Sequence, residues 1–331
     1  MKLDLLLNSK YPLLACICFV LSMPSAGSLL TKVYGLLQMN VGVLYVAVPS
    51  SLVVLGLYFY CKRAGKEPFA DLLFTGAFAG LIGTFAYDVS RVPFHLFGQR
   101  IFAPISAYGV WIADANMSSR FTEVIGWSYH FWNGIMFGVM YAMFMTNRAW
   151  WWAVIWGCLL ETIAFVSPFG RIFGLWGNPL AIGIAYLGHV AYGIPLGMMI
   201  QKWEAVHGWM VKQPKAFVLF SCVFGVLALI NPILLPENQQ RDAQAKPGEF
   251  HVFGDRLNPD WQRISAPGKI VVRNDREAEV FIVKGKSAEQ PLSAKSSLEL
   301  SFDHTGVIPV GLKGEIRTRN SFVISEPVEN P

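Results

Sequence analysis

Residues 215–250 read KAFVLFSCVFGVLALINPILLPENQQRDAQAKPGEF, and within this stretch the sequence changes from apolar to polar and charged residues. Up to Pro236 the residues are apolar over a length that can cross a bilayer as a helix, about 20 residues. Beyond Pro236 the tail carries 27 charged residues in 95 positions, against 22 in the preceding 236. The sequence therefore predicts three parts: a transmembrane helical domain at 1–236, a linker at 237–248 and a water-soluble domain at 249–331.

Composition excludes several classes of protein. Charged residues make up 15% of the chain, whereas soluble domains carry about 25%, so neither a single soluble globule nor a disordered chain fits. The net charge of +5 does not indicate nucleic-acid binding, because the excess Lys and Arg lie in short loops between apolar runs. All five cysteines lie in or beside apolar segments, so the tail has neither a disulfide framework nor a thiolate metal ligand.

Seven apolar windows are long enough to span a membrane as helices. They are residues 11–34, 41–61, 69–90, 122–146, 149–167, 178–200 and 215–236. The first window is interrupted at Pro24 and is similar to a secretion signal. We expect it to stay uncleaved, because Pro24 would occupy the −3 position for cleavage after Ala26.

Loops rich in Lys and Arg predict the orientation. The loops after the second, fourth and sixth windows are the basic ones and should face the cytoplasm. The N-terminus is then cytoplasmic and the tail periplasmic, in a bacterial inner membrane. The loop at 89–121 is rich in aromatic residues and proline, which is typical of an interfacial or re-entrant segment over the outer mouth of the bundle.

Two windows carry the same motif, His-x-x-x-Gly-x-x-x-Gly, which begins at His130 and at His189. Residues four apart share a helix face, and glycines on such a face let membrane helices approach closely, so both histidines should point into the bundle. The preceding windows each carry a carboxylate after small residues, Asp88 in one and Glu161 in the other. We interpret this pattern as a parallel internal repeat.

These four ionisable side chains form the candidate metal site. An ionisable group in hydrocarbon costs about 2.5 kcal/mol or more, so it persists only with a partner or a function. Imidazole nitrogen with carboxylate oxygen suits iron, zinc, manganese or copper. Alternatively, His130 and His189 are the axial ligands of a haem b, and the carboxylates accept hydrogen bonds from their rings. Five further residues are candidates to support the site: His95, Glu123, Tyr129, Asn133 and Tyr192.

Structural roles explain the same residues in another way. His130 could bond Glu161 or a backbone carbonyl only to hold helices together, and His189 could do the same. Asp88 could pair with Arg91, which lies three residues further along the same helix. No residue of the chain is identified as catalytic.

The tail has the pattern of a small all-β sandwich. Short alternating apolar runs are separated by Asn, Asp, Gly and Pro. The runs occupy residues 249–253, 269–273, 279–284, 297–302, 307–311 and 321–325.

From Ala266 the tail reads APGKIVVRNDREAEVFIV, which resembles the core of the cupredoxin-like family. The resemblance implies a sandwich fold and a docking role. In copper-binding members His, Cys, His and usually Met hold the metal, whereas here Glu279 stands where the first His is expected. The tail holds no Cys or Met, and its histidines are His251 and His304, so a blue-copper centre is excluded on ligand grounds.

The leading hypothesis is an inner-membrane protein that binds a transition metal or haem in the periplasmic half of its bundle, for redox or metal-handling work. The β domain would cap that face or dock a periplasmic or membrane protein partner, and membrane lipids are the other expected partner. A non-catalytic subunit or assembly factor of a larger membrane complex is the first alternative. An intramembrane metal-dependent hydrolase and a proton-coupled transporter are further ones, so whether the protein is an enzyme stays open.

Overall fold

The computed structural model describes residues 10–97, 102–173, 175–234, 246–253, 256–285, 288–313 and 321–327. These residues form two compact units that do not follow the order of the chain. One comprises Met1–Pro93, Ser128–Arg171 and Leu175–Ala228, and the other comprises Phe94–Trp127, Ile172–Gly174 and Leu229–Pro331. The tail thus shares a unit with residues that the sequence assigned to the membrane domain, and most of the expected linker at 237–248 lies outside the described residues.

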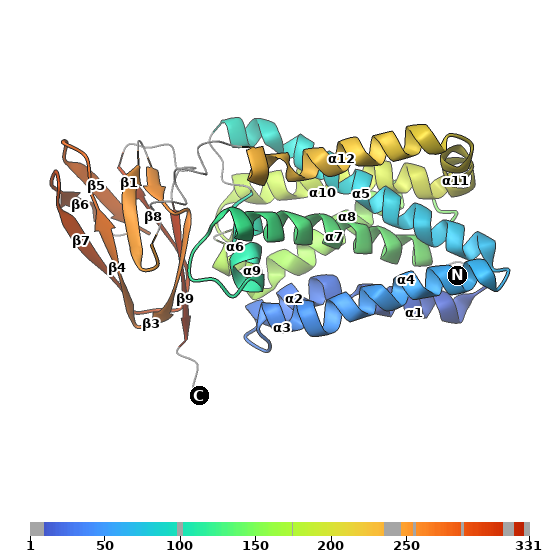
Figure 1. Ribbon diagram of the computed structural model, residues 1–331, viewed down its shortest axis with the longest axis horizontal. Helices are drawn as coiled ribbons and strands as arrows, with labels where there is room; N and C mark the ends of the chain where they lie inside the picture. The colour runs from blue at the N-terminus through green and yellow to red at the C-terminus, as the bar shows by residue number, and fades with distance from the viewer. Residues whose placement is uncertain are drawn as a thin grey trace. The chain divides into compact units, whose positions relative to one another are not determined.

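The first unit is helical. Its helices, three of which (α5, α7 and α12) continue into the second unit, are α1 (Pro12–Ser22), α2 (Pro24–Val33), α3 (Met39–Val41), the π-helix η2 (Gly42–Ala47), α4 (Val48–Arg63), α5 (Glu67–Leu96), α7 (Arg120–Met145), α8 (Trp151–Val166), α10 (Pro179–Gln201), α11 (Trp203–Lys212) and α12 (Pro214–Leu234) (Figure 1). Several begin at proline, whose missing N–H has no helical partner at that position. At α10, the side chain of Asn178 caps the helix by accepting from the N–H of Ala181.

Four stretches within the described residues are long and apolar enough to cross a membrane: Pro12–Val33, Met39–Arg63, Glu67–His95 and Pro179–Gln201. Two shorter apolar helices, Trp151–Val166 and Pro214–Val226, overlap the fifth and seventh windows. Seven spans are therefore not confirmed, although each window holds a helix. Pro24 does not end the first window, because Met23 before it keeps helical backbone angles.

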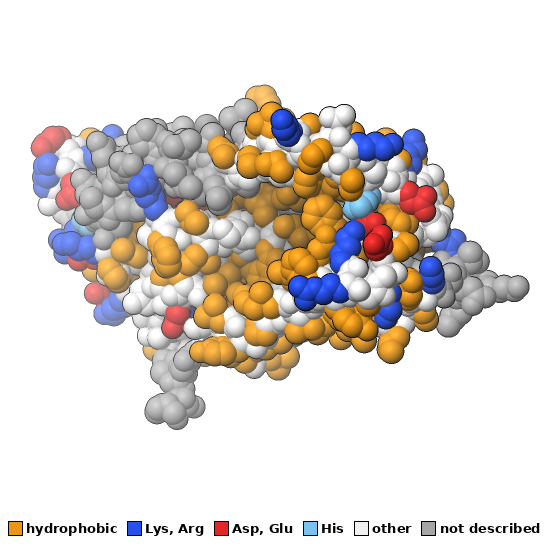
Figure 2. Space-filling view, turned by 45° about the vertical axis from the view of Figure 1, so that its right-hand side comes forward, with side chains coloured by type: hydrophobic (Ala, Val, Ile, Leu, Met, Phe, Trp, Pro, Cys, Tyr) orange, Lys and Arg blue, Asp and Glu red, His pale blue; other side chains and the backbone are white. Residues whose placement is uncertain are grey.

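Apolar side chains lie on the outside of the helical unit as well as inside it. Leu13, Tyr45 and Val89 are each at least 65% exposed. Hydrophobic side chains cover much of the visible face of this unit, and charged ones gather at its end (Figure 2). Soluble proteins rarely expose apolar surface on this scale, so the exposed apolar helices indicate a membrane protein.

The second unit holds a β-sandwich of two sheets (Figure 1). One sheet has the order β2 (Arg256–Asn258), β1 (Glu249–Phe253), β4 (Gly268–Arg273) and β7 (Ser297–Phe302). The other has the order β3 (Trp261–Ala266), β9 (Ser321–Pro327), β8 (Gly306–Leu312), β5 (Val280–Lys284) and β6 (Gln290–Leu292). Apolar residues of both sheets are buried together, among them Phe250, Ile270 and Val323. The expected sandwich is confirmed, with three strands, β2, β3 and β6, beyond those expected.

Residues 116–118, just before α7, add to the edge strand β3 of the sandwich. Met117 pairs with Gln262 in antiparallel fashion, and the N–H of Ser118 donates to the carbonyl of Trp261 at 3.0 Å. The N–H of Arg263 donates in turn to the carbonyl of Asn116 at 2.7 Å. This part of the loop at 89–121 is therefore a structural component of the sandwich, which the interfacial interpretation did not anticipate.

Side chains of the same unit strengthen this attachment. The guanidinium of Arg263 binds the carboxylates of Asp114 and Glu326, the latter at 2.8 Å. The other carboxylate oxygen of Glu326 accepts from the indole N–H of Trp111 in α6 (Ala103–Ile112) at 3.0 Å. Arg263 thus joins the loop before α7 to β9 across strand β3.

Candidate functional site

Helices α5 and α7 approach closely where glycines face each other. Gly138 of α7 has no room for a Cβ atom, because the backbone of Gly76 and Gly80 in α5 lies against it. At Gly134 the hydroxyl of Thr84 takes up the corresponding space. His130 lies one turn from Gly134 in α7, and Asp88 lies one turn from Thr84 in α5. The contact between Gly134 and Thr84 therefore brings His130 and Asp88 to the same level.

Helices α8 and α10 repeat this contact. A Cβ atom at Gly193 would lie 2.5 Å from the Cα atom of Val154, and one at Gly157 would lie 2.6 Å from the carbonyl oxygen of His189. The structure thus contains two helix pairs joined through glycines, as the repeated motif predicts. A symmetry axis relating the two pairs stays a prediction.

Asp88 and His130 form a polar pair between α5 and α7. Atom Nε2 of His130 lies 3.0 Å from one carboxylate oxygen of Asp88 and 3.1 Å from the other. Both side chains are largely buried, at 15% and 11% exposure. Asp88 therefore has a partner in His130, and its pairing with Arg91, which the structural alternative gave it, stays a prediction.

Glu161 and His189 form the corresponding pair between α8 and α10. Atom Nδ1 of His189 lies 3.4 Å from a carboxylate oxygen of Glu161 and 3.0 Å from the carbonyl oxygen of Ala185. Since a carbonyl oxygen only accepts, we assign a proton to Nδ1. Atom Nε2 of His189 then remains available as an acceptor when the ring is neutral.

Tyr87 of α5 lies against both imidazole rings. Its ring centroid is 5.7 Å from that of His130 and 4.9 Å from that of His189. The guanidinium carbon of Arg91, one turn further along α5, lies 4.3 Å from the centroid of the Tyr87 ring. Tyr87, Asp88, Arg91, His130, Glu161 and His189 together form the Tyr87 cluster.

Sequence reasoning did not assign Tyr87 or Arg91 to the site. The signal that could have found them is their spacing: they are four residues apart on one face of α5 and adjoin Asp88. The contact with Gly188 of α10 is visible only in the structure, where a Cβ atom at that glycine would lie 2.7 Å from the Tyr87 ring and 2.8 Å from Cδ of Arg91.

Two of the proposed supporting residues, Tyr129 and Tyr192, hold helices together, and a third, Asn133, contacts Tyr129 within α7. The hydroxyl of Tyr129 donates to the carbonyl of Ser25 at 2.6 Å and shares a hydrogen bond with the side chain of Asn133. The hydroxyl of Tyr192 donates to the carbonyl of Gly134 at 2.9 Å. These contacts position the glycine-lined helices and involve none of the ionisable groups.

The remaining two, His95 and Glu123, belong to the second unit. The ring centroid of His95 lies 5.4 Å from that of Phe102. Glu123 lies in the first turn of α7, where its N–H donates to the carbonyl of Ser119 at 2.9 Å.

The donor geometry of the Tyr87 cluster fits hydrogen bonding better than a metal cage. Across the described part of the chain, no three His, Cys, Asp or Glu side chains converge so as to hold an ion. Atom Nε2 of His130 faces Asp88 at 3.0 Å, and ligation of a haem by His130 and His189 stays a prediction. In the cluster, each imidazole has a carboxylate beside it. In metal sites, such a carboxylate orients the ligating ring.

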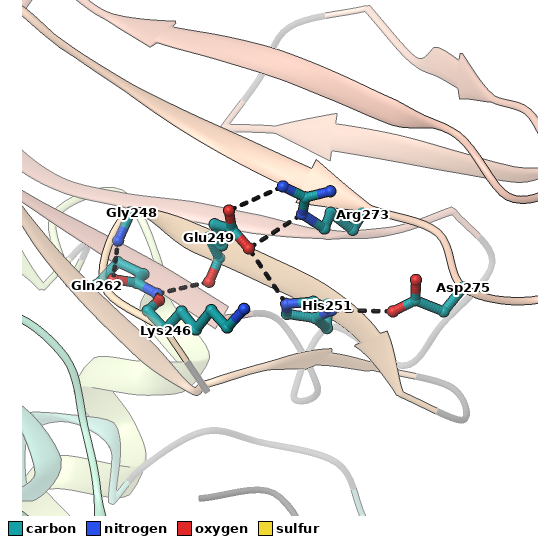
Figure 3. Close-up of polar contacts among 7 residues, drawn as sticks. All are labelled: Lys246, Gly248, Glu249, His251, Gln262, Arg273 and Asp275. Carbon is teal, nitrogen blue, oxygen red and sulfur yellow. Dashed lines mark hydrogen bonds and ion pairs between the residues drawn. The ribbon is translucent and has the colours of Figure 1, made fainter. Parts of the chain in front are cut away.

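The β domain holds a second group of polar side chains, on strands β1 and β4 (Figure 3). Arg273 donates to both oxygens of Glu249, at 2.9 and 3.0 Å, and these hydrogen bonds hold the pKa of Glu249 below its ordinary value. His251 lies between carboxylates, with Nδ1 2.9 Å from Asp275 and Nε2 3.5 Å from Glu249. The two ring nitrogens of His251 face different ways, so the two carboxylates do not converge on one point. The group therefore links β1 to its neighbouring segments.

The sequence matches no protein-family model, and no curated protein is similar to it. Among solved structures, a purple cupredoxin from Nitrosopumilus maritimus is similar at 16% identity with a TM-score of 0.21, covering 24% of this chain and 99% of its own. An oxidised point mutant of amicyanin is similar at 7% identity with a TM-score of 0.22, covering 25% of this chain and 88% of its own. Both are similar to the C-terminal β region, and cupredoxin is also the family that the string at Ala266 resembles.

Proposed function

We propose that this membrane protein is a proton-coupled transporter and that the Tyr87 cluster is its proton-binding site. The observation that carries the proposal is the meeting of two imidazole–carboxylate pairs, from four helices, at the ring of Tyr87. Ionisable residues inside membrane helices are rare and typically mark ion pathways or proton relays.

The charges of the cluster support uptake of one proton. Asp88 and Glu161 bring two negative charges and Arg91 brings one positive charge. All three residues are buried, at 5–8% exposure, and a net charge in such surroundings is costly. One proton, on an imidazole or on a carboxylate, makes the cluster neutral. Imidazole is suited to this role because it titrates near neutral pH.

Infrared difference spectroscopy tests the proposal directly. The purified protein in lipid nanodiscs is titrated across about pH 5 to 8, the range in which histidine titrates, and the carboxyl and imidazole bands are followed. We expect a titrating signal that Glu161→Gln and Asp88→Asn alter, whereas Glu204→Gln, an exposed position on α11, leaves it unchanged. A spectrum without titrating bands, or bands insensitive to both substitutions, would contradict the proposal.

Binding of a transition-metal ion is the second candidate, favoured by one observation. Nδ1 of His189 is oriented by Ala185 and Glu161, as in ligating histidines whose other nitrogen faces the metal. Metal content per chain decides this question: about one ion that is lost in His189→Gln and kept in His207→Gln would favour it. A metal-free protein that shows the infrared titration favours the proton site alone.

Orientation in a bacterial inner membrane, with a cytoplasmic N-terminus and a periplasmic β domain, is part of the proposal. The distribution of Lys and Arg among the loops supports it. A role of the β domain in docking a protein partner is likewise proposed, from its position outside the apolar helices in the sequence.

A further inference from the structure

A second group of ionisable side chains lies near the beginning of α5. Atom Oδ1 of Asp71 lies 2.5 Å from Nζ of Lys62 in α4 and 3.3 Å from Nε2 of His207 in α11. Asp71 and Asp88 are 17 positions apart on the same helix, about 25 Å at the helical rise per residue. The group around Asp71 is therefore separate from the Tyr87 cluster.

The three side chains are within reach of water. Their exposures are 35% for Lys62, 18% for Asp71 and 19% for His207, against 7% for Glu161. A proton can thus exchange between the solvent and His207 without any opening of the helical unit. The same oxygen of Asp71 faces both cationic partners, so a charge on His207 adds directly to the interaction that Lys62 already makes.

Helix α11 connects α10 to α12 and is ten residues long. Met210 is its one fully buried residue, and the others are half-buried or exposed. A helix this short is marginal on its own, so its stability depends on tertiary contacts such as the pair between His207 and Asp71. Beyond α11, Phe217 of α12 packs on Phe74 and Phe78 of α5, at 5.8 and 5.0 Å between ring centroids.

We propose that the Lys62, Asp71 and His207 side chains form a proton-binding latch that fastens α11 to α5. When the imidazole of His207 takes a proton from water, it forms a full ion pair with Asp71 and α11 is held. When the proton returns to water, the ring is neutral, Asp71 keeps Lys62 as its partner, and α11 is released more easily.

Charged and titratable groups of α4 and α5 surround Lys62 and Asp71. α4 contributes Lys62 and Tyr58, and α5 contributes Asp71 and Glu67, with Tyr58 and Glu67 interacting electrostatically with Lys62. The carboxylates of Asp71 and Glu67 both offset the charge of Lys62. This inference does not depend on the function proposed for the Tyr87 cluster.

Hydrogen exchange of the amides in α11 tests the latch in the full chain in nanodiscs. After correction for the intrinsic pH dependence of exchange, we expect protection of residues 203–212 to fall by about fivefold from pH 5.5 to pH 8, the size of one partly exposed ion pair. In His207→Gln, protection should be the same at both pH values and as low as in the wild type at pH 8. In His207→Lys, which keeps a positive charge, protection should be the same at both pH values and as high as in the wild type at pH 5.5. Glu204→Gln is the matched control on the same helix and should behave as the wild type.

The outcomes separate the latch from a purely structural contact. Equal protection at both pH values in the wild type overturns the proposal, and so does a pH dependence that survives in His207→Gln. If His207→Gln does not fold, the comparison of the wild type with His207→Lys decides alone: the same pH dependence in both overturns the latch.

Discussion

At Gly134, the space that a methyl group would need is taken by the hydroxyl of Thr84. That hydroxyl donates to the carbonyl of Gly80 at 2.8 Å, within its own helix, so it cannot turn away without losing its partner. The neighbouring residue one turn on, His130, is placed by this contact. The geometry of the Asp88–His130 pair therefore depends on the glycine at position 134.

Gly134→Ala should destabilise the helical unit by about 2 kcal/mol, because a methyl group inserted into a packed core typically costs about 1–3 kcal/mol. Thermal unfolding in detergent measures the change. Gly183→Ala on α10 is the control, since a Cβ atom there meets nothing within 4 Å. Thr84→Ala in the Gly134→Ala background should restore part of the loss, and equal effects of the two glycine substitutions would refute the interpretation.

Glu249 makes the β domain sensitive to acid. Because Arg273 lowers the pKa of Glu249 in the folded state, the pair stabilises the fold above the unfolded pKa of about 4.3. That stabilisation is lost as the pH falls through the lower folded pKa. Glu249→Gln should therefore weaken protection of β1 against hydrogen exchange at pH 7 and have no effect in strong acid.

The matched control is Glu299→Gln, whose partner Lys269 is 63% exposed. This substitution should change the protection of its strand little at either pH, because exposed ion pairs contribute little to stability. A loss of β1 protection in Glu249→Gln that is the same at pH 7 and in strong acid would contradict the assignment to the ion pair.

At the scale of elements, the sequence predicts most helices and the longer strands, because their apolar periodicity is strong. Strand β3 was missed: Gln262 and Arg263 break the alternation, yet Gln262 is fully buried, since its amide binds the backbone of Gly248 and Glu249. Strands β2 and β6, of three residues each, are too short for any period to show.

The candidate site was predictable only in part, for a similar reason. The glycine stripes indicated which faces of α7 and α10 point inward, and both histidines lie there beside a carboxylate. That Tyr87 lies against both imidazole rings, with Arg91 stacked on Tyr87, depends on how α10 is rotated against α5. Gly188 fixes that rotation by leaving room for the Tyr87 ring, and nothing in the spacing of a single helix reports such a contact.

Arg263→Ala should loosen the attachment of residues 114–118 to β3 and β9. The largely buried guanidinium has two carboxylate partners, and removing it leaves the largely buried carboxylate of Glu326 without that partner. The expected loss of stability is about 2–3 kcal/mol, measured by denaturant unfolding of the full chain. Lys269→Ala, at a highly exposed position of β4, should have little effect, and an equal effect of both would contradict the role of Arg263.

At the scale of the whole molecule, the pairing of Met117 with Gln262 constrains the path of the chain. Residues 116–118 and strand β3 touch, so both lie on the same side of the membrane. The number of crossings between them is therefore even. Helices α7, α8, α10 and α12 satisfy this condition if all four cross, although only α10 among them meets the length and hydropathy expected of a span.

Accessibility from one side of intact vesicles tests this parity. Cysteines introduced at Ser119 and at Lys269 should react with a membrane-impermeant reagent from the same side, and one introduced at Lys212 should react from the opposite side. A protein without native cysteines provides the background. Reaction of positions 119 and 269 from opposite sides would refute the strand pairing.

The same pairing also sets an order in time. Residues 116–118 are synthesised well over a hundred residues before β3, the strand whose edge they complete. Until the tail has been synthesised, the backbone groups of that short segment cannot pair with β3, and the indole of Trp111 cannot donate to Glu326. Completion of the sandwich therefore requires that all the helices between residue 118 and β3 have been synthesised and leave the two segments on one side of the membrane.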